Sequence, residues 1–251
     1  MTSLSGSNTD AVAELASIDS ARAPIFLQPN DNRGFELAAM LDLESNDIQS
    51  APTDGWFLGC HHGELALCHS TESSLVISER SVRTKIDEAR GTHLAKACMA
   101  RPGRKVLDAF GGWGIDGFTL SALGCEVSIL EVNPLIYTMA RHLAKELGCE
   151  AKVVCTDAER YLHCTAEIFD VVYFDPMFPG HPKSAKPARR MQILELLARK
   201  DTDIDQVFKL AKSRTRDRIV VKRRRTEKPK RPIPDWQVSG RAVRFDVYQI
   251  R

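Results

Sequence analysis

No stretch of this 251-residue sequence approaches the run of about 18 apolar residues that a membrane-spanning helix requires. The seven cysteines form no CxxC pair, and most lie within apolar runs, which is typical of reduced, buried thiols. Residues 1–10 are rich in Ser and Thr and lack the basic segment and apolar core of a secretory signal. We therefore expect a soluble, folded protein in the cytoplasm, with no disulfide framework and no membrane association.

The formal net charge of +2 conceals an asymmetry along the chain. Residues 1–100 contain 7 basic and 14 acidic residues, whereas residues 101–251 contain 28 basic and 19 acidic residues. The imbalance is greatest between residues 176 and 231, with 18 basic and 6 acidic residues. No amphipathic apolar face accompanies this charge, so the sequence favours a polyanionic partner over a membrane surface.

The first hundred residues predict a flexible N-terminus over 1–22 and a small α+β region over 23–101. In the second segment we expect a helix at 35–43, a hairpin of strands at 56–60 and 64–68, a short strand at 75–77 and a helix at 90–100. The His and Cys residues of the hairpin follow no common ligand spacing and alternate between its two faces. We therefore expect no metal site.

From residue 102 to residue 251, predicted strands and helices alternate. Strands are expected at 106–107, 127–130, 153–154, 171–174 and 218–221, helices at 116–123, 134–147, 191–197 and 202–212, and a closing pair of strands at 236–238 and 243–248. This alternation predicts an α/β domain with a Rossmann-like sheet, mostly parallel with an antiparallel last strand.

A glycine-rich turn follows the first of these strands, in the segment 108–114, DAFGGWG. Gly112 and Gly114 would let the backbone pass close to a ligand, where a Cβ would collide. With Gly117 they also spell GxGxxG, which alone would support a dinucleotide enzyme. Asp108 favours S-adenosylmethionine (SAM) instead, because a carboxylate there would repel a pyrophosphate but could orient the loop or accept from the ammonium group of SAM.

Acidic residues also follow the next two strands. Glu131 is placed to accept from the ribose hydroxyls of a cofactor, and Asp157 is placed to accept from an adenine amino group. Ligands of open α/β sheets bind at the carboxyl ends of the strands, so three acids at three consecutive strand ends indicate a cofactor site.

The fourth strand ends in Asp175-Pro176-Met177-Phe178-Pro179. This run resembles the Asp/Asn-Pro-Pro-aromatic motif of enzymes that methylate exocyclic amines of bases. The lone pair of such an amine is delocalised into the ring, so acceptors that bond its N–H groups free it for attack. The Asp175 carboxylate and the Pro176 carbonyl are candidate acceptors, and Phe178 is a candidate for stacking on the base. These three residues are the predicted catalytic group.

A basic run, residues 222–231, holds seven Lys or Arg residues in ten. It follows the fifth strand, on the same sheet edge as Asp175, and we interpret it as a loop that captures RNA phosphates beside the catalytic pocket. The expected RNA-binding residues are Lys222, Arg223, Arg224 and Arg225, extended along the rim by Lys183, Lys186, Arg189 and Arg190.

Several of these segments together resemble the ribosomal RNA small subunit methyltransferase J family. The resemblance covers about residues 75–251, and its most specific pieces are DPMFP at 175–179 and RFDVY at 244–248. It implies a class I SAM-dependent methyltransferase that acts on the N2 amine of a guanine in 16S ribosomal RNA. By resemblance, the cofactor contacts fall on Ile115, Asp116, Glu131, Val132, Asp157, Ala158 and Asp175.

The sequence thus predicts an RNA guanine-N2 methyltransferase whose cofactor is SAM and whose partner is ribosomal RNA or the small ribosomal subunit. An NAD-dependent oxidoreductase stays open because of the literal GxGxxG, but it leaves the DPMFP run unexplained. A non-catalytic RNA-binding or assembly factor also stays open, and the motif chemistry alone permits DNA adenine methylation. The sequence leaves the oligomeric state undetermined.

Overall fold

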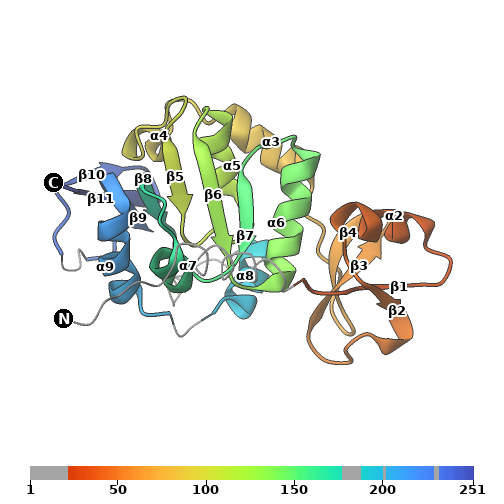
Figure 1. Cartoon of the computed structure of the whole chain (residues 1–251). Coiled ribbons are helices and arrows are strands. Elements are labelled where there is room, and N and C mark those ends of the chain that lie inside the picture. The colour runs from red at the N-terminus through yellow and green to blue at the C-terminus, as the bar shows by residue number, and fades with distance from the viewer. Residues whose placement is uncertain (1–21, 177–187, 200–201, 229–231) are drawn as a thin grey trace, which may run out of the picture.

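The computed structural model describes residues 22–176, 188–199, 202–228 and 232–251, which build two sheets side by side (Figure 1). The smaller sheet, from the N-terminal part of the chain, lies beyond helix α6 at one end of the larger sheet. Its elements are β1 (Ile25–Leu27), α2 (Asn32–Leu41), β2 (Ser45–Asp47), a 3₁₀ turn (Ile48–Ser50), β3 (Trp56–His61) and β4 (Glu64–His69).

The larger sheet and its helices take up the rest of the described chain. Their elements are α3 (Glu79–Asp87), α4 (His93–Ala97), β5 (Lys105–Asp108), α5 (Ile115–Ala122), β6 (Glu126–Glu131), α6 (Pro134–Glu146), β7 (Lys152–Cys155), α7 (Ala158–Cys164), β8 (Phe169–Phe174), α8 (Arg189–Leu197), α9 (Ile204–Arg214), β9 (Thr215–Arg224), β10 (Trp236–Ser239) and β11 (Val243–Gln249).

The strand order of the larger sheet is β10-β11-β9-β8-β5-β6-β7. Strands β5 to β9 run parallel, whereas β11 pairs antiparallel with both β9 and β10. The predicted Rossmann-like sheet with an antiparallel last strand is therefore confirmed. The order reverses at β5, where the chain crosses from β7 back to β8, and this reversal opens a crevice at the carboxyl ends of the strands.

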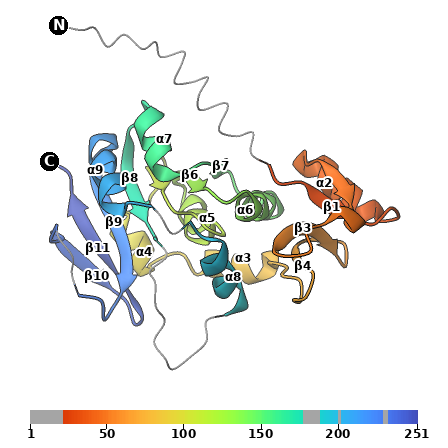
Figure 2. The ribbon, with the colours of Figure 1, turned by 90° about the horizontal axis from the view of Figure 1, so that it is seen from below.

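Helices cover both faces of this sheet (Figure 2). One core packs α3, α4, α5 and α6 against one face, with the fully buried Phe118 among its members. The other core packs α7 and α9 against the opposite face, around Phe169 and Phe174. Strand β8, FDVVYF, is apolar on both faces because both are covered, which is the pattern of an inner parallel strand.

The small sheet has the order β2-β1-β3-β4 and shares a third core with the large domain. Leu37 and Leu67 of the small sheet region pack in one cluster with Met139 of α6 and Ile193 of α8. Helices α3 and α4 pack in the core of the large sheet, and the domain boundary between residues 101 and 102 stays a prediction.

Two sequence-based expectations for this region are wrong. The helix expected at 90–100 is only the short α4. Gly91 has a φ of +80°, and the side chain of Thr92 caps the start of α4 by accepting from the N–H of Ala95. The strand expected at 75–77 is a single bridge between Leu75 and Leu67. Helices α3 and α7 had not been expected. None of the helices described is both long and apolar enough to cross a bilayer.

Candidate active site

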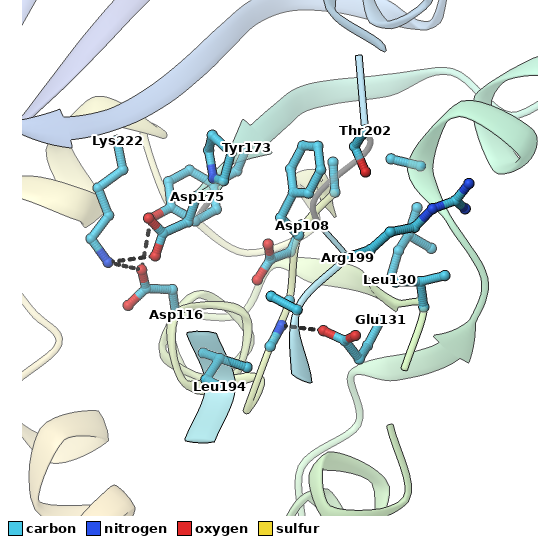
Figure 3. A pocket seen from close by; sticks show the side chains of 18 of the residues that line it. Asp108, Asp116, Leu130, Glu131, Tyr173, Asp175, Leu194, Arg199, Thr202 and Lys222 are labelled. Atoms are coloured by element: carbon cyan, nitrogen blue, oxygen red, sulfur yellow. Dashed lines mark hydrogen bonds and ion pairs between the residues drawn. The ribbon is translucent and has the colours of Figure 1, made fainter. Parts of the chain in front are cut away.

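A cavity of about 880 Å³ opens at the carboxyl edge of the large sheet (Figure 3). It lies over the ends of β5, β6, β8 and β9, and α8 and the start of α9 complete its wall. This is the place where the reversal of strand order leaves room for a ligand, and its volume is typical of a small-molecule site.

The glycine-rich turn after β5 forms one wall of the cavity. Gly112 and Gly114 have φ values of +52° and +77°, a backbone region that residues with a Cβ rarely adopt. A Cβ at Gly114 would also lie 2.5 Å from the ring of Phe118. The turn therefore requires glycine at both positions for its own conformation, and it presents the backbone N–H of Gly112 towards the end of β6.

The carboxylate of Glu131 accepts a hydrogen bond from that N–H. Its Oε2 accepts from the backbone nitrogen of Gly112 at 3.0 Å, and its Oε1 accepts from that of Asn133 at 2.7 Å. Burial raises the pKa of Glu131 to about 7, although the backbone donors favour its charged form. The carboxyl group thus joins the glycine turn to the end of β6 and faces the cavity.

Asp108, at the end of β5, is almost completely buried, and its Oδ1 has no hydrogen-bond partner. Burial raises its pKa well above the usual range, and the nearby carboxylates of Asp116 and Asp175 raise it further. An unpartnered acceptor beside a turn of positive-φ glycines fits the cationic ammonium end of SAM, which would pair with the charged form of this carboxyl group.

Asp157 has a local structural role as well as a place in the cavity wall. It precedes α7, and its Oδ1 accepts from the backbone N–H of Arg160 at 2.8 Å, so it caps the helix. Its Oδ2 lies 3.7 Å from Nη1 of Arg199. Helix capping alone accounts for an acid at this position, and its contact with an adenine amino group stays a prediction.

At the opposite end of the cavity, Lys222 joins two carboxylates (Figure 3). Its Nζ donates to Oδ2 of Asp175 at 2.8 Å and to Oδ2 of Asp116 at 2.7 Å. The hydroxyl of Tyr173 also donates to Asp116 Oδ2, at 2.7 Å. Strand β8 supplies Tyr173, β9 supplies Lys222 and α5 supplies Asp116, and Asp175 directly follows β8, so the cluster exists only in the folded sheet.

The charges in this cluster shift one another's pKa. Burial and Asp116 raise the pKa of Asp175 above its usual value, and Lys222 opposes that rise. For Asp116, Lys222 and the Tyr173 hydroxyl outweigh burial and lower the pKa. Burial opposes the charged form of Lys222, yet the two carboxylates raise its pKa above the usual range. Two acids and one lysine thus share this end of the cavity.

Comparison with known proteins agrees with this geometry. Residues 47–250 match the model of a family described as "Putative SAM-dependent methyltransferase". A protein of Legionella pneumophila strain Corby is 34% identical over 186 residues, 70% of this chain and 76% of the relative. One of Coxiella burnetii strain RSA 331 is 36% identical over 165 residues, 62% of this chain and 65% of the relative. Both are named ribosomal RNA small subunit methyltransferase J.

The chain belongs to the methyltransferase J family of SAM-dependent methyltransferases. Among solved structures, a SAM-dependent methyltransferase of Neisseria gonorrhoeae has the same fold, with a TM-score of 0.67 and 24% identity. That similarity covers 90% of this chain and 96% of the other. The predicted family and fold class are confirmed.

Nearly all residues predicted to hold the cofactor come together in the methyltransferase cavity. Those that line it are Asp108, Gly112, Ile115, Asp116, Glu131, Val132, Asp157, Ala158 and Asp175. Gly114 shapes the turn rather than the cavity wall. The predicted catalytic Pro176 also lines the cavity, whereas Phe178 lies outside the described residues.

Sequence reasoning missed the places of Tyr173 and Lys85 in the cavity wall. For Tyr173 a signal existed, since it lies two residues before Asp175 at the end of a strand, and residues two apart in extended chain point to the same face. Lys85, on α3, reaches the cavity only through tertiary packing. Burial lowers its pKa, and the charge of Arg190 lowers it further.

The basic run differs from the predicted loop. Strand β9 continues to Arg224, so Lys222, Arg223 and Arg224 belong to the strand and not to a loop. Lys222 points into the cavity, and Arg223 is only 8% exposed and pairs with Asp246 and Glu227. Neither side chain is placed to capture phosphates from solvent.

Arg189 also has protein partners. Its Nη2 donates to the carbonyl of Ser73 and lies 3.4 Å from Oε2 of Glu72, and its guanidinium lies 5.9 Å from the ring centroid of Trp56. It therefore joins α8 to the small sheet region, and its role in RNA binding stays a prediction. Arg190 lines the cavity, and Lys183 and Lys186 lie outside the described residues.

Proposed function

We propose that this methyltransferase transfers a methyl group from SAM to the N2 amine of a guanine in small-subunit ribosomal RNA. The observation that carries the proposal is the Asp175 carboxylate, which faces the same cavity as the glycine turn and Glu131. The names of the related proteins support ribosomal RNA of the small subunit as the substrate. The resemblance of the DPMFP run supports an exocyclic amine as the target.

Methyl transfer to an exocyclic amine requires a hydrogen-bond acceptor for its N–H groups. SAM, when bound, supplies a methyl group activated by a positively charged sulfur. Lys222 donates a hydrogen bond to Oδ2 of Asp175, so Oδ1 can accept from an N–H of the target amine. The Pro176 carbonyl is the second candidate acceptor. These bonds draw the nitrogen lone pair out of the ring and orient it for attack, and the methylated amine then loses one proton.

The cofactor would lie along the other carboxyl groups of the cavity. Glu131 is placed for the ribose hydroxyls, Asp108 for the ammonium group and Asp157 for the adenine amine. The partner-free oxygen of Asp108 and the raised pKa of Glu131 support these assignments, since each group gains a partner when a donor binds.

The RNA would approach over the carboxyl edge of the sheet. Arg190 in the cavity wall, Arg225 on the exposed turn after β9 and the neighbouring Arg224 are our proposed phosphate contacts. Lys183 and Lys186, which lie outside the described residues, are also proposed as phosphate contacts. The contacts would be electrostatic and independent of base sequence, so the shape of folded ribosomal RNA would select the target. Such a substrate is consistent with action in the cytoplasm.

The decisive experiment uses ribosomal RNA and small subunits from a strain that lacks this protein. The purified protein and SAM labelled in the methyl group are added to this RNA and, in a parallel reaction, to DNA, and the nucleosides are separated and identified by mass spectrometry. N2-methylguanosine in the small-subunit RNA is the expected product. Label in methyladenine of DNA, or no label in either RNA or DNA, would refute the proposal. If neither RNA nor DNA is labelled but the protein binds the RNA, the result would favour a non-catalytic assembly factor.

A further inference from the structure

Lys222 is held by the sheet in a way that a surface lysine is not. Its strand β9 pairs with β8 on one side, where Phe174 is opposite Val221, and with β11 on the other, where Phe245 is opposite Lys222 itself. Asp175 follows Phe174 directly, so the backbone register sets Lys222 beside Asp175. Side chains on paired inner strands are placed more precisely than those on loops.

The ammonium group of Lys222 is bound from two sides. Nζ donates to Oδ2 of Asp175 at 2.8 Å and to Oδ2 of Asp116 at 2.7 Å, and the Tyr173 hydroxyl fixes that same Asp116 oxygen. The side chain of Lys222 is 24% exposed and that of Asp175 is 36% exposed, so both still reach the cavity. Charge-assisted bonds of this length restrict the orientation of a carboxylate.

We propose that Lys222 is a positioning residue of the methyltransferase, which fixes the Asp175 carboxylate in one orientation and keeps it ionised as an acceptor. This inference rests on the proposed function, in which Asp175 accepts from the target amine. In this arrangement Oδ2 of Asp175 accepts from Lys222, and Oδ1 is available to a substrate.

The surrounding charges explain why a lysine is needed here. The titratable groups around Asp175 belong to six elements or their ends: Asp108 of β5, Asp116 of α5, Tyr173 of β8, Lys222 of β9, Lys85 of α3 and Arg190 of α8. Burial and the negative charge of Asp116 both favour a protonated Asp175. Without Lys222, two carboxylates would face each other across one end of the cavity, and their repulsion would raise the pKa of one of them and favour its protonated form. A protonated Asp175 is a poor acceptor.

The first test needs no RNA. Carbon-13 NMR of protein labelled at the Asp carboxyl groups follows the titration of Asp175, whose signal is assigned by its loss in Asp175→Asn. Lys222→Met should raise the titration midpoint of Asp175 by about one to three pH units. Lys222→Arg, which keeps the charge, should leave the midpoint near that of the wild type. An unchanged midpoint in Lys222→Met would overturn the proposal.

The second test measures single-turnover methyl transfer from pH 6 to pH 9. Lys222→Met should lose about tenfold or more in rate at pH 7 and recover part of the loss towards pH 9, as Asp175 ionises. A lysine that only stabilised the fold would lower the rate equally at every pH. Lys152→Met is the matched control, because Lys152 is exposed at the amino end of edge strand β7, away from the cavity.

The two tests separate the two proposals. A wild-type protein that methylates no RNA refutes the proposed function, while the NMR titration still decides whether Lys222 controls Asp175. Should Lys222→Met fail to fold, Lys222→Gln removes the same charge and keeps a donor for the carboxylates. A rate loss that is independent of pH, with an unshifted midpoint, would reduce Lys222 to a structural residue.

Discussion

Acidification should weaken cofactor binding through buried carboxyl groups, of which Glu131 has a pKa near neutrality. Burial raises the pKa of Glu131 to about 7, and its charged form is the better acceptor for two ribose hydroxyls. The ionised fraction would fall from about nine-tenths at pH 8 to about one-tenth at pH 6, and the apparent affinity falls with the competent fraction. The dissociation constant should therefore rise about tenfold over these two pH units.

Titration calorimetry with S-adenosylhomocysteine, the demethylated product, measures this directly at pH 6, 7 and 8. Binding at pH 7 should release a fraction of a proton, which appears as a dependence of the heat on the ionisation enthalpy of the buffer. Glu131→Gln should bind weakly and lose most of the pH dependence. Glu126→Gln, an exposed change at the other end of β6, should behave as the wild type. A pH dependence that is undiminished in Glu131→Gln would refute the reasoning, because Asp108 accounts only for a remainder.

The raised pKa of Glu131 has the opposite effect on the stability of the ligand-free protein, which falls as pH rises. A carboxyl group whose pKa is raised in the folded state stabilises the fold most below its unfolded pKa of about 4.3, and this contribution is lost as pH rises through the folded pKa. Relative to Glu131→Gln, the ligand-free wild type should lose stability between pH 5 and pH 8 in urea unfolding. Cofactor affinity rises over the upper part of that range.

Three further predictions concern the reaction, the RNA and the fold. Asp175→Ala should lower single-turnover methyl transfer by roughly 30- to 1000-fold, because it removes an acceptor worth about 2–4 kcal/mol in the transition state, while Asp175→Asn retains more activity; a near wild-type rate would contradict the assignment. Arg225→Ala with Lys228→Ala, both exposed, should weaken RNA binding and flatten its salt dependence in filter binding, without affecting cofactor affinity. Asp246→Ala should cost about 3–5 kcal/mol in urea unfolding, because fully buried Asp246 pairs with Arg223 and Arg244. The exposed change Glu36→Ala should leave stability almost unchanged; equal losses would contradict this account.

The RFDVY run at 244–248 illustrates the limits of motif reading. By sequence it was one of the two most specific signs of the family. In the structure it is strand β11, in which Arg244 and Asp246 form a buried ion pair at 2.8 Å that also binds Arg223. Arg244 donates to the carbonyls of Arg224 and Arg225 as well, and so holds the turn that follows β9. Its role is structural, and a sequence pattern does not distinguish that role from a catalytic one.

The sequence by itself determined the sheet, the glycine turn and the acids at the strand ends. These features depend on local preferences: apolar runs form inner strands, glycines permit positive φ, and residues at the carboxyl ends of parallel strands meet at one edge. The cofactor site was therefore predictable, because Asp108, Glu131 and Asp157 each follow a recognisable strand.

Only the tertiary structure decided what the charged residues do. Lys222 and Arg223 are adjacent in the sequence, yet one enters the cavity and the other a buried ion pair, because successive side chains of a strand point to opposite faces. Asp116 meets Lys222 across 106 residues, and Lys85 reaches the cavity from a helix that the sequence had not indicated. The partner of a charge depends on distance in space, which propensity and spacing along the chain do not contain.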